Sequence, residues 1–118
     1  MRTILIVDDE YAALEVLAVL FEGEGFRALK AGDGAEGLRL LAAESVDLVV
    51  TDAEMPLLDG PRMIEAMRAD ARLGQLPVIL MSANGVHAEK VAPPVRAFVH
   101  KPLRFDELLR VVLQLLSA

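Results

Sequence analysis

Short apolar runs without alternation recur along this chain, and longer segments with helical spacing of apolar positions lie between them. The runs are rich in β-branched residues and contain few polar ones. Such runs are typical of strands that are buried on both faces of a parallel sheet. Segment 26–31 is the least apolar of them, and we therefore expect it at an edge of the sheet. The other expected strands are 2–7, 47–51, 77–82 and 96–100.

The segments between the runs predict helices, because their apolar residues repeat at the spacing that forms one helix face. Gly23 and Gly25 follow the first helix as expected for a C-terminal cap, and Asp33 is placed to cap the second. The alternation of strands and helices predicts βαβ units with right-handed crossovers, which is an α/β doubly wound architecture. The expected helices cover about 10–23, 34–44, 61–70 and 104–116.

The segment between the last two expected strands leaves little room for a helix. Pro93 and Pro94 prevent a helix from continuing past about Ala92. We therefore expect a short or irregular helix near 85–91.

Composition narrows the classes of function. A chain of 118 residues is expected to form one domain, 1–118. The absence of cysteine excludes disulfides and thiolate zinc sites. The formal net charge is −6 and no cluster of lysine and arginine occurs, which argues against direct nucleic-acid binding. No apolar stretch is long enough to span a bilayer, and the start of the chain does not look like a secretory signal, so we expect a cytoplasmic protein away from membranes.

Charged and hydroxyl residues follow the apolar runs where the expected strands end. Asp8 and Asp9 follow the first run, Asp52 the third, Ser82 ends the fourth, and Lys101 follows the fifth. In doubly wound sheets, ligands bind beyond the carboxyl ends of the strands, and the first and third strands commonly lie side by side at the switch point. We therefore expect these side chains to share one crevice.

The charges of these residues suggest a metal-assisted phosphoryl site. Neighbouring buried carboxylates repel one another, and Mg²⁺ is commonly held by carboxylates, waters and phosphate oxygens. Mg²⁺ and the ammonium of Lys101 together would offset the charges of Asp8, Asp9 and Asp52. A carboxylate in such a site can act as nucleophile toward a phosphoryl group, and Ser82 can donate a hydrogen bond to a phosphoryl oxygen. An ordinary acidic turn that caps the first helix is the alternative interpretation of the Asp8-Asp9 pair.

Four motifs in order carry a resemblance to a known family. They are VDDE at 7–10, TDAEMPLLDG at 51–60, LMSA at 80–83 and HKP at 100–102. Across its whole length the chain resembles the CheY-like receiver domain of bacterial two-component response regulators. The resemblance implies a flavodoxin-like (βα)5 fold with a five-stranded parallel sheet of order 2-1-3-4-5 and helices on both faces.

The resemblance also implies a set of roles at the site. Asp8, Asp9 and Asp52 would bind Mg²⁺, with Mn²⁺ and Ca²⁺ as alternative ions, and Glu54 would contribute its backbone carbonyl. Asp52 would accept a phosphoryl group from a phosphohistidine on a sensor histidine kinase or a histidine phosphotransfer protein. Lys101 would contact the phosphoryl group.

Further residues would govern switching and the lifetime of the phosphoryl group. Ser82 would supply the switch hydroxyl, and Phe98 matches the aromatic residue that turns inward on activation. Lys101-Pro102 would be a cis peptide. Glu54 and Asn84 stand two residues beyond Asp52 and Ser82, at positions that tune phosphoryl lifetime in the family.

The first helix carries two apolar stripes. We expect Ala13, Val16, Leu17, Leu20 and Phe21 to face the core. A second stripe of Tyr11, Leu14 and Ala18 is either a consequence of a helix that is apolar all round or a docking surface for a helix of the phosphodonor protein.

The leading interpretation is a phosphoacceptor switch that catalyses its own phosphorylation and dephosphorylation and is an enzyme only in that sense. A pseudo-receiver that acts by protein contacts alone and a small Mg²⁺-dependent phosphohydrolase are the alternatives. A flavodoxin-like binding module is disfavoured, because the acidic segment after the first strand would repel phosphate without a metal. The downstream effector is open, as is the choice between a free-standing regulator and a piece of a larger one.

Overall fold

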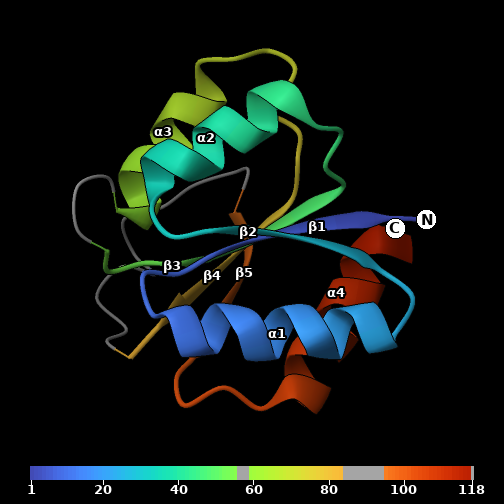
Figure 1. The fold of residues 1–118 in the computed structure, drawn as a ribbon. Coiled ribbons are helices and arrows are strands. Elements are labelled where there is room, and N and C mark those ends of the chain that lie inside the picture. The colour runs from blue at the N-terminus through green and yellow to red at the C-terminus, as the bar shows by residue number, and fades with distance from the viewer. Residues whose placement is uncertain (56–58, 84–94, 118) are drawn as a thin grey trace.

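From β1 to β4 the fold alternates strands and helices, as the sequence predicts (Figure 1). The structure is a computed structural model, and it describes residues 1–55, 59–83 and 95–117. The observed ends lie within one or two residues of the predicted ones. The elements are β1 (Thr3–Val7), α1 (Tyr11–Gly23), β2 (Arg27–Ala31), α2 (Gly34–Ala43), β3 (Leu48–Asp52), α3 (Gly60–Arg68), β4 (Val78–Ser82), β5 (Val95–His100) and α4 (Phe105–Ser117).

The strands form one sheet in the order β2-β1-β3-β4-β5, and the paired strands are parallel. This order confirms the flavodoxin-like topology, including the edge position of β2. In Figure 1, α1 and α4 cover one face of the sheet and α2 and α3 cover the other. The chain adds β2 on one side of β1 and then adds β3, β4 and β5 on the other side. The position between β1 and β3, where the order reverses, is the switch point of such sheets.

Two apolar cores fill the space between the sheet and its helices. Every residue of β1, β3 and β4 is buried, which confirms the prediction of strands covered on both faces. The same prediction is wrong for β5, which lies at the other edge of the sheet and is only partly buried. Alternate residues of a strand point to opposite faces. Ile4 and Ile6 accordingly pack in the core under α1 and α4, and Leu5 and Val7 in the core under α2 and α3.

The predicted faces of α1 are partly right, because Leu17 and Phe21 are buried as expected. Leu14 and Ala18 are buried, so the proposed docking stripe is part of the core, and of its members Tyr11 alone is exposed. Val16 and Leu20, expected in the core, are exposed instead. The buried positions follow the spacing i, i+3, i+4, i+7, and they are Leu14, Leu17, Ala18 and Phe21.

The end of α1 is a Schellman motif. Gly25 has φ of +92°, a conformation that glycine adopts without strain. Its N–H donates to the carbonyl of Glu22, and the N–H of Phe26 donates to the carbonyl of Phe21. The rings of Phe21 and Phe26 meet edge to face at 5.9 Å, which supplies the apolar contact typical of the motif.

The starts of α2 and α3 carry side-chain caps. Asp33 accepts a hydrogen bond from the N–H of Glu36 at 2.8 Å, which confirms the cap of α2. Asp59 caps α3 in the same way, with Pro61 in the first turn.

Some predictions fall outside the described residues. These are the short helix near 85–91, the effect of Pro93 and Pro94, and the position of Asn84. Among the described helices, none combines the length and the apolar character that a membrane span requires.

Candidate functional site

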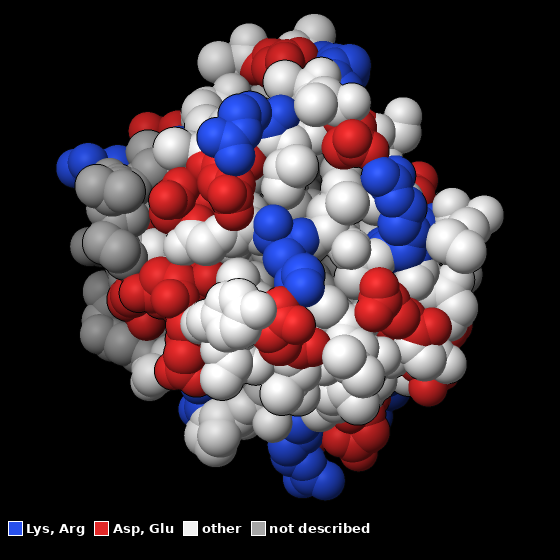
Figure 2. Space-filling model, in the orientation of Figure 1, with Lys and Arg blue, Asp and Glu red and all other residues white. Residues whose placement is uncertain are grey.

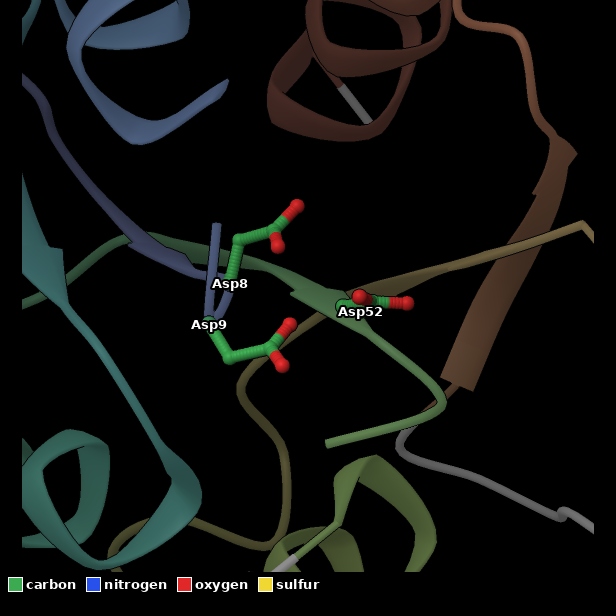
Figure 3. Close-up of side chains that lie close together, drawn as sticks. All are labelled: Asp8, Asp9 and Asp52. Atoms are coloured by element: carbon green, nitrogen blue, oxygen red, sulfur yellow. The ribbon is translucent and has the colours of Figure 1, made fainter. Parts of the chain in front are cut away.

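Three carboxylates lie close together at the carboxyl ends of the strands. Asp8 and Asp9 directly follow β1, and Asp52 is the last residue of β3, which pairs in parallel with β1. One oxygen of each carboxylate lies within 4.8 Å of an oxygen of each of the others. Figure 3 shows the three side chains projecting beyond these two strand ends. The predicted meeting of these residues in one crevice is therefore confirmed.

Two of the carboxylates are withdrawn from solvent. Asp8 is 2% exposed and Asp52 is 4% exposed, whereas Asp9 is exposed. Backbone amides satisfy part of their need for hydrogen bonds. The N–H of Glu10 donates to Asp8 Oδ1 at 3.0 Å, and the N–H of Glu54 donates to Asp52 Oδ1 at 3.3 Å. Burial raises the pKa of Asp8 above its ordinary value, while the Glu10 N–H and the Lys101 ammonium oppose the rise.

Lys101 brings a positive charge to the buried pair. Its Nζ lies 3.1 Å from Asp52 Oδ2 and 3.6 Å from Asp8 Oδ2. Burial alone would lower the pKa of Lys101, but the hydrogen bond to Asp52 and the charges of both carboxylates outweigh burial and raise it. The backbone N–H of Lys101 donates to the carbonyl of Ser82, which ties the segment after β5 to the end of β4. The Lys101-Pro102 peptide is cis, as predicted.

The donor set fits a hard divalent cation. Three carboxylates face one ammonium, so a negative charge remains within a partly buried crevice. Carboxylate and carbonyl oxygens are the ligands that Mg²⁺ uses in proteins, usually together with waters and phosphate oxygens. The residues at these strand ends therefore suit Mg²⁺.

Ser82 and Glu54 form a contact that the sequence interpretation missed. Ser82 is fully buried, and its Oγ donates to Glu54 Oε2 at 2.8 Å. The sequence suggested Glu54 for its backbone carbonyl and Ser82 for a phosphoryl contact, but it did not connect their side chains. The available signal was that Glu54 follows β3, Ser82 ends β4, and these strands were expected to be neighbours.

Gly60 is a second residue whose importance emerges from the structure. A Cβ at this position would lie 2.5 Å from the carbonyl oxygen of Asp52 and 3.0 Å from Cα of Ala53. The start of α3 therefore packs directly on the backbone that carries Asp52. An Asp-Gly pair is a common turn signal, but nothing in the sequence indicates this close approach.

Phe98 lies in β5, opposite Leu80 of β4. It is partly buried against the core under α2 and α3, and its ring meets that of His100 edge to face at 5.5 Å. A role in switching stays a prediction for this residue.

Acidic and basic side chains are mixed on the visible surface. On the face shown in Figure 2, lysine and arginine are interspersed with acidic residues and form no continuous basic surface. The net charge of −6 agrees with this distribution.

Comparisons with known proteins agree with the fold. The family model of the response regulator receiver domain matches residues 4–113. The chain is 31% identical over 115 residues to protein PilH of Pseudomonas aeruginosa, with 95% of each chain covered. It is 35% identical over 112 residues to transcriptional regulatory protein GlrR of Escherichia coli. That alignment covers 92% of this chain but 25% of GlrR, so the chain spans about a quarter of the regulator's length.

Solved structures show the same architecture. The response regulator protein TrrA of Thermotoga maritima, determined in complex with Mg(2+)-BeF, matches with a TM-score of 0.87 and 30% identity. The match covers 98% of this chain and 99% of that one. The receiver domain of the Francisella response regulator 1452 matches with a TM-score of 0.88 and 28% identity, covering 99% and 98%. The chain belongs to the family of response regulator receiver domains, which act in two-component signalling.

Proposed function

We propose that Asp52 is the phosphoacceptor of a two-component phosphorelay and takes its phosphoryl group from a phosphohistidine on a partner. The observation that supports this assignment is the position of Asp52, which is buried, within hydrogen-bond distance of Lys101 and beside Asp8 and Asp9. The donor belongs to a sensor histidine kinase or a histidine phosphotransfer protein. A cytoplasmic location belongs to the same proposal.

The transfer exchanges one bond at phosphorus for another. An oxygen of the Asp52 carboxylate attacks the phosphorus atom, a P–O bond forms, and the P–N bond to the imidazole breaks. The electron pair of that bond stays on the imidazole nitrogen, which is free to take up a proton. Lys101 stabilises the negative charge on the phosphoryl oxygens during the transfer.

Asp8, Asp9, Asp52 and the backbone carbonyl of Glu54 would hold Mg²⁺. When bound, Mg²⁺ supplies positive charge that offsets the carboxylates and the incoming phosphoryl group. The buried pair Asp8 and Asp52 gains most from this compensation, because water relieves its repulsion least.

Phosphorylation then shifts the domain between two conformations. Ser82 donates its hydroxyl proton to a phosphoryl oxygen, and Phe98 turns inward with the segment that carries Ser82. Such a shift requires that the phosphoryl group interact more favourably with one conformation than with the other. Hydrolysis of the aspartyl phosphate by water returns the domain to its resting state, with Glu54 and Asn84 tuning the rate.

Intact mass spectrometry tests the proposal. We expect wild-type protein to gain one phosphoryl group from acetyl phosphate or phosphoramidate when Mg²⁺ is present, and not when it is chelated. Phosphoramidate is informative because it carries the P–N bond of a phosphohistidine. The Asp52→Asn variant, which keeps the shape of the side chain, should gain none. An equal gain in the variant would refute the assignment of Asp52, and no gain in wild type would favour a pseudo-receiver.

A further inference from the structure

Glu54 and Ser82 lie at the ends of neighbouring strands and are joined by their side chains. Asp52 of β3 pairs with Met81 of β4, so the residues just beyond these positions are brought together. The Oγ of Ser82 donates to Oε2 of Glu54 at 2.8 Å. Ser82 is fully buried, whereas Glu54 is exposed. The switch hydroxyl is therefore engaged with a carboxylate in the unphosphorylated protein.

The chemistry of a hydroxyl makes this contact exclusive. A serine side chain has one O–H proton to donate. A hydrogen bond to an ionised carboxylate is stronger than one to a neutral acceptor. Donation to Glu54 and donation to a phosphoryl oxygen on Asp52 cannot occur at the same time.

We propose that Glu54 is a positioning residue that holds Ser82 in the resting arrangement and competes with the phosphoryl group for its proton. This inference rests on the proposed phosphorylation of Asp52. It assigns Glu54 a role in the conformational equilibrium that is separate from any effect on the water that hydrolyses the phosphate. We call the Ser82–Glu54 hydrogen bond the latch.

The latch predicts a measurable penalty on binding of a phosphoryl group. If only a fraction of the protein has Ser82 available, the apparent affinity for the ligand equals the intrinsic affinity multiplied by that fraction. Replacing the carboxylate of Glu54 by the neutral amide of Gln weakens the hydrogen bond without changing the size of the side chain. The variant should then bind a phosphoryl analogue more tightly.

A double-mutant cycle separates the latch from simple charge repulsion. The probe is beryllofluoride with Mg²⁺, titrated by calorimetry into wild type, Glu54→Gln, Ser82→Ala and the double variant. With Ser82 present, Glu54→Gln should tighten binding by about fivefold or more, as expected from weakening a hydrogen bond to a charged group. In the Ser82→Ala background the same substitution retains only the effect of removing a charge, so its gain should be several-fold smaller.

Glu10→Gln is the matched control. Glu10 lines the hollow that also contains Asp8 and Lys101, and its substitution removes one negative charge near the site. It should change beryllofluoride affinity equally in the presence and absence of the Ser82 hydroxyl. Nuclear magnetic resonance gives a second, independent measurement of the position of the conformational equilibrium. In ligand-free Glu54→Gln, the amide signal of Ser82 should move toward its position in beryllofluoride-bound wild type.

The outcomes distinguish the two proposals. Binding by wild type with equal gains from Glu54→Gln in both backgrounds would overturn the latch and leave the phosphoacceptor function intact. An unmoved Ser82 signal together with equal gains would overturn it by two independent measurements. Failure of wild type to bind beryllofluoride or to accept a phosphoryl group would overturn the proposed function and the latch with it.

Discussion

The carboxylate of Asp8 is buried beside those of Asp9 and Asp52, and its burial disfavours the ionised form. The raised pKa of Asp8 expresses this cost. A carboxyl whose pKa is higher in the folded state than in the unfolded chain stabilises the fold at low pH, where it is protonated in both states. That contribution is lost as pH rises through the folded-state pKa. Metal-free protein at neutral pH therefore carries the cost of an ionised Asp8.

The substitution Asp8→Asn should consequently raise the free energy of unfolding of metal-free protein at neutral pH. The amide keeps an oxygen that can accept from the N–H of Glu10, and it removes the buried charge. The gain should shrink as pH falls through the raised pKa of Asp8, because the wild-type carboxyl then becomes neutral as well. Urea unfolding of both proteins at a series of pH values, with a chelator present, measures this difference in the free energy of unfolding. A variant that is less stable than wild type at neutral pH would contradict the sign of this effect.

Addition of Mg²⁺ provides the companion measurement. Ligand that binds only the folded state stabilises it by mass action. Millimolar Mg²⁺ should therefore stabilise wild type more than Asp8→Asn, because the variant lacks one of the proposed ligands. Equal stabilisation would show that Asp8 is not a ligand.

At the scale of elements, α1 shows what hydrophobic spacing can and cannot determine. Its apolar residues occupy so much of the circumference that two neighbouring faces match the helical period. Of the expected core positions, Leu17 and Phe21 are buried, whereas Val16 and Leu20 are exposed. The contacts with the sheet and with α4 select the observed face, and these contacts are tertiary. The ends of the helices were predictable, because glycine, proline and aspartate act through local backbone chemistry.

The Schellman motif gives a prediction at this scale with a control in the same helix. Gly25→Ala forces a residue with a Cβ to adopt φ of +92°, which should destabilise the protein by about 1 kcal/mol or more. Gly23→Ala lies in the last turn of α1, and its Cβ would meet no atom within 4 Å. It should stabilise the protein by roughly 0.5 kcal/mol through the lower entropy of the unfolded chain.

Chemical denaturation of both glycine variants measures the two predicted changes in the free energy of unfolding. The two substitutions add the same methyl group, so opposite signs point to backbone conformation as the cause. Loss of stability in both, by similar amounts, would mean that the α1 terminus does not have the described geometry.

At the scale of the whole molecule, the parallel sheet brings residues that are distant in the sequence together in one site. Five short apolar runs predicted the strands, and parallel pairing places the carboxyl ends of all five strands on the same side of the molecule. For that reason Asp8, Asp52 and Lys101 could be expected together although they lie far apart in the chain. The Ser82–Glu54 bond and the packing of Gly60 on Asp52 were not predictable in this way, because they depend on side-chain rotamers and on the approach of α3.

The most direct test of this account locates the phosphoryl group. Wild-type protein is incubated with phosphoramidate and Mg²⁺, reduced with borohydride and digested, and the peptides are sequenced by tandem mass spectrometry. Reduction converts an aspartyl phosphate to homoserine and leaves unmodified aspartate unchanged. The account predicts conversion at Asp52 alone, dependent on Mg²⁺ and absent at Asp8 and Asp9. Conversion at Asp8 or Asp9, or at none of the three in phosphorylated protein, would contradict it.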